Sequence, residues 1–414
     1  MAEKFKLGFI GAGFIARFQA VALRMVRDAE LAGVCALKGA EELAAFAKET
    51  GVGDCKVFPN IAELCNHCDA VAVFVPNYVR LDIIGAVVDA VKKGANLKGI
   101  ICEKPLGRTV AEAKEIVRLG QDAGVPTAYF ENQIHMKTVK AALKQLERVQ
   151  RAMGPLSLVR SSEEHGGPHE PWFWDPTRQG GGVLSDMACH SIAVNWFALT
   201  PPEKPINFMK PVAVNAETAL LKWGQPVYRK QLLERTGVDY AKTPAEDFAT
   251  GIVTFQNPET GQKVKGQFTN SWMFDKQGLR LYMDGLGPGY AFEINSLRSP
   301  LEIFIADAAA EAVANAEQAL EKATATRGLL PVQPNEADLY GYVDELEDAV
   351  ASFRAGRDAK LTWEYGCEIT KLCQAAYMSA ERKKTIDLTD PEVQKELDHY
   401  TSLIAQGKGA EVLL

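Results

Sequence analysis

The sequence predicts an α/β protein in which a doubly wound parallel sheet precedes a second domain built on a largely antiparallel sheet. Three observations support this fold class. Short apolar runs alternate with helical patterns over the first 130 residues, a glycine-rich turn follows the first of these runs, and longer strand patterns begin after about residue 150. The predicted parts are a dinucleotide-binding domain at 1–130, a substrate-binding and oligomerisation domain at 131–390, and a tail at 391–414.

The N-terminal part repeats one strand–helix unit. Its apolar runs lie at 6–10, 31–37, 56–58, 70–75, 99–102 and 127–130. Helical patterns lie between them at 14–26, 41–49, 61–65, 81–93 and 110–123. Strands that alternate with helices of this length are joined by right-handed crossovers into a parallel sheet covered on both faces. Six such strands suit a doubly wound, dinucleotide-binding fold.

The C-terminal part has longer strand patterns separated by Gly, Pro and Asn turn residues. These patterns lie at 156–161, 212–221, 248–255, 264–272, 279–284, 290–294 and 301–305, and helices are predicted at 184–197, 336–353 and 363–383. The alanine-rich segment 306–325 predicts a surface helix, with an oligomer contact or a lid as alternatives, and the role of 306–335 stays open. The tail after residue 390 shows no core pattern.

Composition and charge exclude several function classes. The chain has 414 residues, 47% of them hydrophobic and 24% charged, with a net charge of −7. Nucleic-acid backbones and anionic membranes attract clustered positive charge, so we expect neither as a partner. The N-terminus lacks the apolar core of a signal peptide, and no apolar run reaches the ~18 residues of a membrane span, so we expect a cytoplasmic protein. In such a reducing compartment, we expect the eight cysteines to be free thiols, most of them buried.

The turn after the first strand indicates a dinucleotide site. Gly11 permits the tight turn from strand to helix, Gly13 lets a pyrophosphate approach the backbone, and Ala16 lets helix and strand pack closely. The alternative is a glycine turn that serves packing alone. The second strand ends without the carboxylate that usually holds the ribose, and Lys38 follows it. Lys38 suits a 2′-phosphate or is a solvated turn lysine, so the predicted coenzyme is NAD or NADP.

Two further motifs carry candidate chemistry. Lys104 follows the fifth strand, in Cys-Glu-Lys-Pro, where the carboxyl ends of parallel strands face the ligand crevice. Three glycines at 180–182 lead into a helix that holds Asp186 and His190, four residues apart and so on one helix face. A carboxylate beside an imidazole equips it as a general base. The alternatives are an ion pair at a strand end and a surface Asp–His pair.

The glycine turn, Glu103-Lys104-Pro105 and Gly181-Gly182 followed by Asp186 and His190 together resemble the Gfo/Idh/MocA family, over roughly residues 5 to 385. The resemblance implies an N-terminal Rossmann domain and a C-terminal α/β domain with an open, mostly antiparallel sheet that often forms the interface of a homodimer or homotetramer. It also implies an NAD(P)-dependent oxidoreductase acting on a ring hydroxyl of a sugar, glycoside or polyol.

Carried over residue by residue, the resemblance assigns Lys104, Asp186 and His190 to catalysis. His190 takes the hydroxyl proton, directly or through Lys104, while Lys104 polarises the oxygen and Asp186 orients the group. The implied coenzyme contacts are Gly11, Gly13, Phe14, Ile15, Ala16, Lys38, Val75, Pro76, Asn77, Glu103 and Lys104. The chain departs from the family on the substrate side, where Arg80 replaces the usual histidine and Ala193 an acid, and where 130–135 lacks the usual arginine.

The segment 163–178 is dense in polar and aromatic residues just before the catalytic helix. The tryptophans could stack on a sugar ring and the polar groups could bind hydroxyls, or the segment is a packed loop. The candidate substrate contacts are Asn132, His135, His165, His169, Trp172, Trp174 and Arg178. No metal site is predicted, because the His165–His169 pair has no obvious third ligand and Cys65, His67 and Cys68 have no second pair.

Two other functions stay open on the sequence alone. Some members of the family are glycosidases that hold NAD tightly, oxidise the sugar at C3, eliminate the aglycone, add water and reduce the ketone again. A cofactor-bound regulator would keep the fold without turnover, which the intact Lys104, Asp186 and His190 argue against. The product separates the first two, since only a dehydrogenase yields net NAD(P)H.

Overall fold

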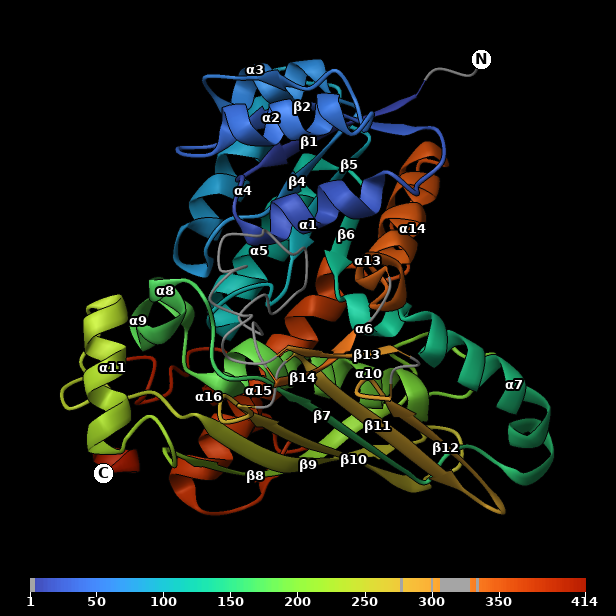
Figure 1. Cartoon of the computed structure of the whole chain (residues 1–414). Coiled ribbons are helices and arrows are strands. Elements are labelled where there is room, and N and C mark those ends of the chain that lie inside the picture. The colour runs from blue at the N-terminus through green and yellow to red at the C-terminus, as the bar shows by residue number, and fades with distance from the viewer. Residues whose placement is uncertain (1–3, 276–277, 299–300, 306–327, 333–334) are drawn as a thin grey trace. The chain divides into compact units, whose positions relative to one another are not determined.

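The computed structural model describes residues 4–275, 278–298, 301–305, 328–332 and 335–414. It divides into two compact units (Figure 1). One unit takes Met1–Lys137 and Ala337–Lys371, and the other takes Thr138–Glu336 and Leu372–Leu414. The units therefore interleave along the chain, whereas the sequence-based boundaries are continuous. Among the described residues, no helix combines the length and apolar character that a membrane span requires.

The first unit is built on a six-stranded parallel sheet, as predicted. Its strands are β1 (Phe5–Ile10), β2 (Ala29–Cys35), β3 (Lys56–Val57), β4 (Ala70–Val73), β5 (Gly99–Glu103) and β6 (Thr127–Phe130). They lie in the order β3-β2-β1-β4-β5-β6, and every pair is parallel. This is the doubly wound order, in which the strand sequence reverses between β1 and β4. Ligands of such sheets bind at the carboxyl edge, near that reversal.

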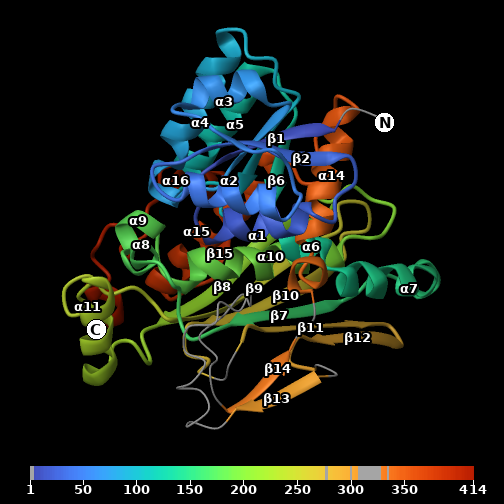
Figure 2. The ribbon, with the colours of Figure 1, turned by 45° about the horizontal axis from the view of Figure 1, so that its top comes forward.

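The helices of this unit come from both ends of the chain. They are α1 (Phe14–Leu23), α2 (Ala40–Glu49), α3 (Ile61–His67), α4 (Asn77–Lys92), α5 (Val110–Ala123), α6 (Asn132–His135), α13 (Glu336–Leu339) and α14 (Tyr342–Arg354). Figures 1 and 2 show α14, in orange, beside the blue helix α1. The rings of Phe18 and Tyr342 meet edge to face at 4.7 Å. Phe353 fills the space that a side chain at Gly99 would need.

The second unit is built on a seven-stranded mixed sheet. Its strands are β7 (Leu158–Glu164), β8 (Lys210–Ala219), β9 (Phe248–Gln256), β10 (Lys263–Ser271), β11 (Arg280–Gly287), β12 (Tyr290–Asn295) and β15 (Ile386–Asp387), in the order β12-β11-β7-β10-β9-β8-β15. Only the pair β7–β10 is parallel among these neighbours, so the predicted mostly antiparallel sheet is confirmed. A separate antiparallel ribbon joins β13 (Leu301–Ile305) to β14 (Gly328–Val332).

One long helical segment lies on this sheet, against β7 and β10 (Figure 2). It begins with a π-helical turn, Leu184–Ala188, and continues as α10 (Cys189–Leu199). The other helices of the unit are α7 (Lys137–Met153), α8 (Pro171–Trp174), α9 (Pro176–Gln179), α11 (Pro226–Thr236), α16 (Pro391–Leu397) and α17 (Ala410–Leu413). The long helix α15 (Trp363–Arg382) contributes to both units.

The structure differs from the sequence-based elements in two respects. Several helices were not predicted, the longest of them α7 and α11. The tail after residue 390 does contribute to a core, because Leu397 and Ile404 are buried and the N–H of Leu403 donates to Glu381 at 2.7 Å. The predicted helix at 306–325 lies outside the described residues. The described cysteines are free thiols, six of them buried.

The predicted helix 336–353 is broken into α13 and α14 at Gly341. Gly341 adopts φ 90°, which lies outside the helical region and which L side chains rarely adopt. A Cβ at this position would collide with the carbonyl oxygen of Asn132 in α6. The side-chain amide of Asn132 donates to the carbonyl oxygen of Tyr340 at 2.7 Å, which holds the bend against α6. The helical pattern in the sequence carries no information on this contact.

We expect Gly341→Ala to destabilise the fold much more than Gly356→Ala. Gly356 also has positive φ, at 67°, but a Cβ there meets nothing within 4 Å. G356A should therefore lower the free energy of unfolding by about 1 kcal/mol, the cost of a left-handed alanine. G341A adds the collision with Asn132 and should cost about 3 kcal/mol or more. Urea denaturation of both variants measures the difference, and equal losses would contradict the assigned contact.

Candidate functional site

The glycine turn after β1 has the geometry of a dinucleotide site. Gly11 has φ 106°, and a Cβ on it would collide with the carbonyl oxygen of Phe74. Gly13 caps α1 without any side-chain hydrogen bond, and no atom lies within 4 Å of where its Cβ would stand. Ala16 is fully buried where α1 meets the sheet. The N-terminus of α1 therefore faces open space over a residue with no side chain, which suits a pyrophosphate.

The region after β2 presents no carboxylate. Leu37 and Lys38 are exposed, and Gly39 begins α2 with φ 76°. An exposed leucine offers an apolar surface and Lys38 a positive charge at the edge where a ribose is held in this fold. Both interpretations of Lys38, as a 2′-phosphate contact and as a solvated turn lysine, remain compatible with this geometry.

The turns after β4 and β5 are tied together by Arg80. This buried residue of α4 donates to the carbonyl oxygens of Pro105 and Val75, the latter at 3.3 Å. Pro105 follows a cis peptide bond from Lys104. The arginine that stands at the family's usual histidine position thus connects two turns at the carboxyl edge of the sheet. Asn77, at the start of α4, is buried at the same edge.

Lys104 is positioned through its backbone by Glu103. The N–H of Lys104 donates to Oε2 of Glu103 at 2.6 Å, and Glu103 is the last residue of β5. Behind it, the buried carboxyl of Glu345 in α14 accepts a hydrogen bond from Nε2 of Gln19 at 2.7 Å. Burial, followed by the charge of Glu103, raises the pKa of Glu345 well above its usual range. Helix α14 therefore places a carboxyl group that favours its neutral form beside α1, the predicted coenzyme helix, and near the turn that holds Lys104.

In the second unit, the turn before Asp186 is held by Glu246 and Tyr377. Oε1 of Glu246 accepts hydrogen bonds from the N–H groups of Gly182 and Leu184, both at 3.0 Å. The Tyr377 hydroxyl donates to the same oxygen at 2.6 Å and accepts from the N–H groups of Gly182 and Ser185. A Cβ on Gly181 would collide with that hydroxyl, and a Cβ on Gly182 would collide with Glu246, which explains these two glycines. The sequence reading missed both residues.

Asp186 and His190 lie in consecutive parts of one helical segment, the first in the π-helical turn and the second in α10. Such turns are frequent at functional sites. Oδ2 of Asp186 accepts a hydrogen bond from the indole N–H of Trp272 at 3.2 Å. Nε2 of His190 lies 3.9 Å from Oε2 of Glu163 on β7, and both side chains are buried. Direct pairing of Asp186 with His190 stays a prediction, whereas Glu163 is a carboxylate partner that sequence reasoning missed.

The predicted substrate residues fall into different environments. His165 is buried, and its Nδ1 accepts a hydrogen bond from the N–H of Gly167 at 3.0 Å, so the neutral ring carries its proton on Nε2. His169 is exposed, and Trp172 is half-buried and stacks on Phe173 at 3.8 Å. Arg178 is exposed beside Asp175, at 3.4 Å. Asn132 and His135 are buried in α6 of the first unit.

Trp174 packs in the interior, as the packed-loop alternative for the segment 163–178 predicts. Its side chain has no exposed surface, and its indole N–H donates to the carbonyl oxygen of Pro168 at 3.1 Å. The ring meets Trp223 at 4.7 Å and Trp272 at 5.1 Å. We therefore leave Trp174 out of the proposed substrate contacts. Because Trp272 also binds Asp186, this aromatic cluster supports the predicted catalytic carboxylate from behind.

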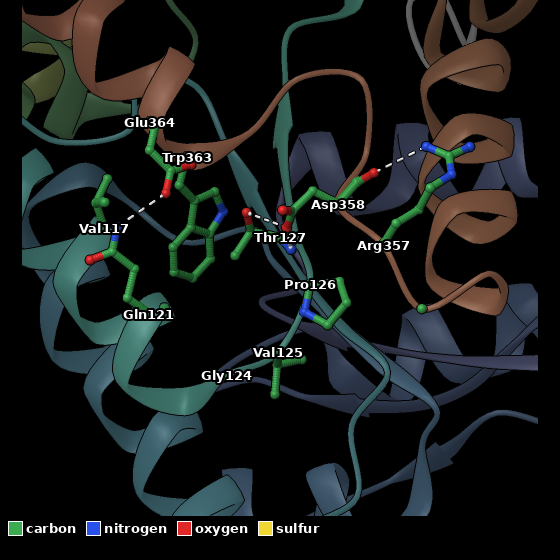
Figure 3. Close-up of a pocket in the computed structure, with 12 residues that line it drawn as sticks. Val117, Gln121, Gly124, Val125, Pro126, Thr127, Arg357, Asp358, Trp363 and Glu364 are labelled. Atoms are coloured by element: carbon green, nitrogen blue, oxygen red, sulfur yellow. Dashed lines mark hydrogen bonds between the residues drawn. The ribbon is translucent and has the colours of Figure 1, made fainter.

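The pocket in Figure 3, with a volume of about 300 Å³, is lined by residues of the first unit, none of which belongs to the glycine turn or the lysine turn. It is lined by the end of α5, the start of β6 and the segment before α15. The N–H of Thr127 donates to Asp358 at 2.7 Å, and Gln121 donates to Glu364 at 3.3 Å. Thr127 begins β6, so the pocket opens at the amino edge of the sheet, opposite the edge where ligands of this fold bind.

Glu246 should make stability fall as pH rises. Burial raises its pKa to about 7, above the value of ~4.3 expected in the unfolded chain. Between these values the folded state binds the extra proton, so the free energy of unfolding falls as pH increases. Glu246→Gln removes this effect. Relative to wild type, E246Q should gain on the order of 2 kcal/mol between pH 5 and pH 8 in urea denaturation, whereas a constant difference would contradict the shift.

Gly13→Ala and Gly11→Ala should separate binding from folding. G13A places a methyl group in the open space before α1 and should raise the dissociation constant of NAD(H) about tenfold or more, with little change in unfolding free energy. G11A should instead destabilise the fold by about 2 kcal/mol or more, because of its φ and the collision with Phe74. Calorimetric titration and thermal unfolding measure the two effects. Unchanged binding by G13A would exclude this turn as the coenzyme site.

Comparison with known proteins identifies two matching parts of the chain. A family described as an oxidoreductase family with an NAD-binding Rossmann fold matches residues 5–130, and the GFO/IDH/MocA C-terminal domain matches residues 141–285. The 1,5-anhydro-D-fructose reductase of Ensifer adhaerens is 28% identical over 195 residues, which cover 46% of this chain and 56% of the relative. Glucose-6-phosphate 3-dehydrogenase of Bacillus subtilis is 26% identical over 196 residues, which cover 46% and 53%.

The chain thus matches about half the length of these two curated relatives. Among solved structures, GenD2 from gentamicin A biosynthesis in complex with NAD has the same fold, with a TM-score of 0.71 and 20% identity, over 94% of this chain and 97% of that chain. The doubly wound sheet, the glycine turn and the mixed second sheet agree with both family matches. The chain belongs to the Gfo/Idh/MocA family of NAD-binding oxidoreductases.

Proposed function

We propose that this protein oxidises a ring hydroxyl of a sugar or polyol, with hydride transfer to the nicotinamide of NAD or NADP. The observation that carries the proposal is the buried pair of His190 and Glu163, an imidazole beside a carboxylate, in a chain of an NAD-binding oxidoreductase family. Such a pair suits a general base that receives a hydroxyl proton. The named relatives act on sugars or their derivatives, which supports a small carbohydrate as the substrate class.

The first unit supplies the groups that would hold the coenzyme. Gly11, Gly13 and the N-terminus of α1 fit the pyrophosphate, with Phe14, Ile15 and Ala16 in the first turn of α1. Val75, Pro76, Asn77, Glu103 and Lys104 form the turns after β4 and β5, at the same carboxyl edge. Lys38 is the candidate contact with the ribose or its phosphate. Bound NAD(P) supplies a hydride acceptor.

The second unit supplies the proton chemistry. We assign His190 to accept the hydroxyl proton at Nε2, directly or through Lys104, while the Lys104 ammonium polarises the reacting oxygen. Asp186, which accepts a hydrogen bond from the Trp272 indole, is assigned to orient the catalytic assembly. The proposed substrate contacts are His165, His169, Trp172 and Arg178 of this unit and Asn132 and His135 of the first unit. A homodimer or homotetramer and a cytoplasmic location remain predictions from the sequence.

A substrate screen with His190→Ala tests this assignment. Sugars and inositols would be screened with NAD and with NADP by absorbance of the reduced coenzyme. H190A should lose about 100-fold or more in kcat/KM while keeping its affinity for coenzyme, since general-base catalysis contributes about that factor. His399→Ala, at an exposed histidine of the C-terminal segment, is the matched control. Normal turnover by H190A would refute its role as the base.

The same samples address the redox-neutral alternative. Denaturing the purified protein and identifying released nucleotide by mass spectrometry tells whether coenzyme stays bound. Net NAD(P)H with a free sugar supports the dehydrogenase proposal. Release of an aglycone from an aryl glycoside without net NAD(P)H would overturn it in favour of a glycosidase that uses bound NAD.

A further inference from the structure

We propose that Glu163 is a positioning residue that stabilises the protonated form of His190 during proton transfer. The inference rests on the proposed function and names a group that the sequence motifs do not include. Oε2 of Glu163 lies 3.9 Å from Nε2 of His190, and the two side chains are only 9% and 6% exposed. A buried carboxylate at this distance attracts an imidazolium far more strongly than an exposed one, because solvent screens the pair less.

The pleat of β7 directs Glu163 toward α10. Alternate residues of the strand are buried, namely Val159, Ser161 and Glu163, and His165 continues this row beyond the strand end. Alternate residues of a strand share one face of the sheet. Ser161 donates to Oδ1 of Asn195 in α10 at 2.6 Å, so this is the face that the helix covers.

Two hydrogen bonds fix α10 over β7 and β10 near the pair of Glu163 and His190. One is the bond from Ser161 to Asn195. The other runs from Nδ2 of Asn270 to Oγ of Ser191 at 3.0 Å, and Asn270 is the residue of β10 that lies opposite Glu163. The separation of Glu163 and His190 is therefore set by a strand and a helix rather than by a loop. Groups held on such elements are positioned more precisely than groups on loops.

Glu163 differs from the other titratable groups of the second unit that lie around His190. Asp186 has one carboxylate oxygen engaged with the Trp272 indole at 3.2 Å. His165 accepts at Nδ1 from a backbone N–H, and Cys189 donates from its Sγ to the carbonyl oxygen of Asp186 at 3.3 Å. The buried row of β10 that faces the helix holds no titratable side chain. It consists of Val264, Gly266, Phe268 and Asn270. Within this unit, Glu163 is thus a carboxylate at ion-pair distance from the imidazole.

The neighbouring residue provides a matched control. Glu164 follows Glu163 on β7 but has the opposite side-chain direction, and it pairs with Arg280 at 2.7 Å and accepts from Ser271 at 3.1 Å. Glu163→Gln and Glu164→Gln remove the same charge from adjacent positions. Only the first faces α10, so only E163Q should change the behaviour of His190.

The decisive measurement is the pH dependence of kcat/KM for the oxidation, with wild type, E163Q, E163D and E164Q. Without the carboxylate, His190 loses its proton more easily, so the acid limb of the E163Q profile should move about one pH unit lower. Its plateau kcat should fall about tenfold or more with little change in KM, and E163D should recover part of both effects. An unchanged acid limb in E163Q, or an equal shift in E164Q, would overturn the inference.

An NMR titration of His190 separates failure of this inference from failure of the proposed function. The chain has six histidines, so the His190 ring resonance can be assigned by its loss in H190A. The titration uses the protein alone and needs no substrate. A lower titration midpoint in E163Q but not in E164Q supports the pair even if no sugar is oxidised. Equal titration midpoints in the wild type, E163Q and E164Q refute the inference even if the wild type is an active dehydrogenase.

Discussion

The start of the helical segment that carries Asp186 and His190 depends on one buried carboxyl group. Glu246 accepts hydrogen bonds from the backbone of Gly182 and Leu184 and from the hydroxyl of Tyr377. Together these groups satisfy N–H donors at the start of the helical segment, where a helix leaves its donors without internal partners. Gly181 and Gly182 are required because Tyr377 and Glu246 approach so closely that a Cβ would collide with them. These two glycines of the run are therefore a consequence of contacts with residues far along the sequence.

From this anchor, the remaining contacts fix the two predicted catalytic groups. The π-helical turn places Asp186 against Trp272, which packs on the buried Trp174. The helix α10 then runs over β7, where Glu163 meets His190. The segment 163–178 thus contributes twice. Its first residue faces the imidazole, and its tryptophan at 174 supports the carboxylate through Trp272. An interpretation of this segment as substrate-binding alone would miss both contributions.

The sequence was sufficient for features that depend on neighbouring residues. The parallel sheet, the glycine turn and the position of Lys104 after β5 follow from apolar runs and turn residues close together in the chain. Features that depend on distant contacts were missed. The break at Gly341 results from α6, and the return of α14 to the first unit results from its packing on α1. Glu163 and Glu246 were not singled out from the sequence, because only the fold shows that both are buried near the helical segment that holds His190.

Each unit contains a buried carboxyl group with a raised pKa. Glu345 in the first unit and Glu246 in the second are buried carboxyls whose pKa is raised chiefly by burial. A helix from late in the sequence is involved in each case. Helix α14 carries Glu345 itself, and α15 carries Tyr377, which donates a hydrogen bond to Glu246. A neutral carboxyl can stay buried at a lower desolvation cost than a charged one, while its oxygen still accepts hydrogen bonds. The C-terminal helices thus complete the interior of both units, and each half of the predicted machinery is organised by contacts within its own unit.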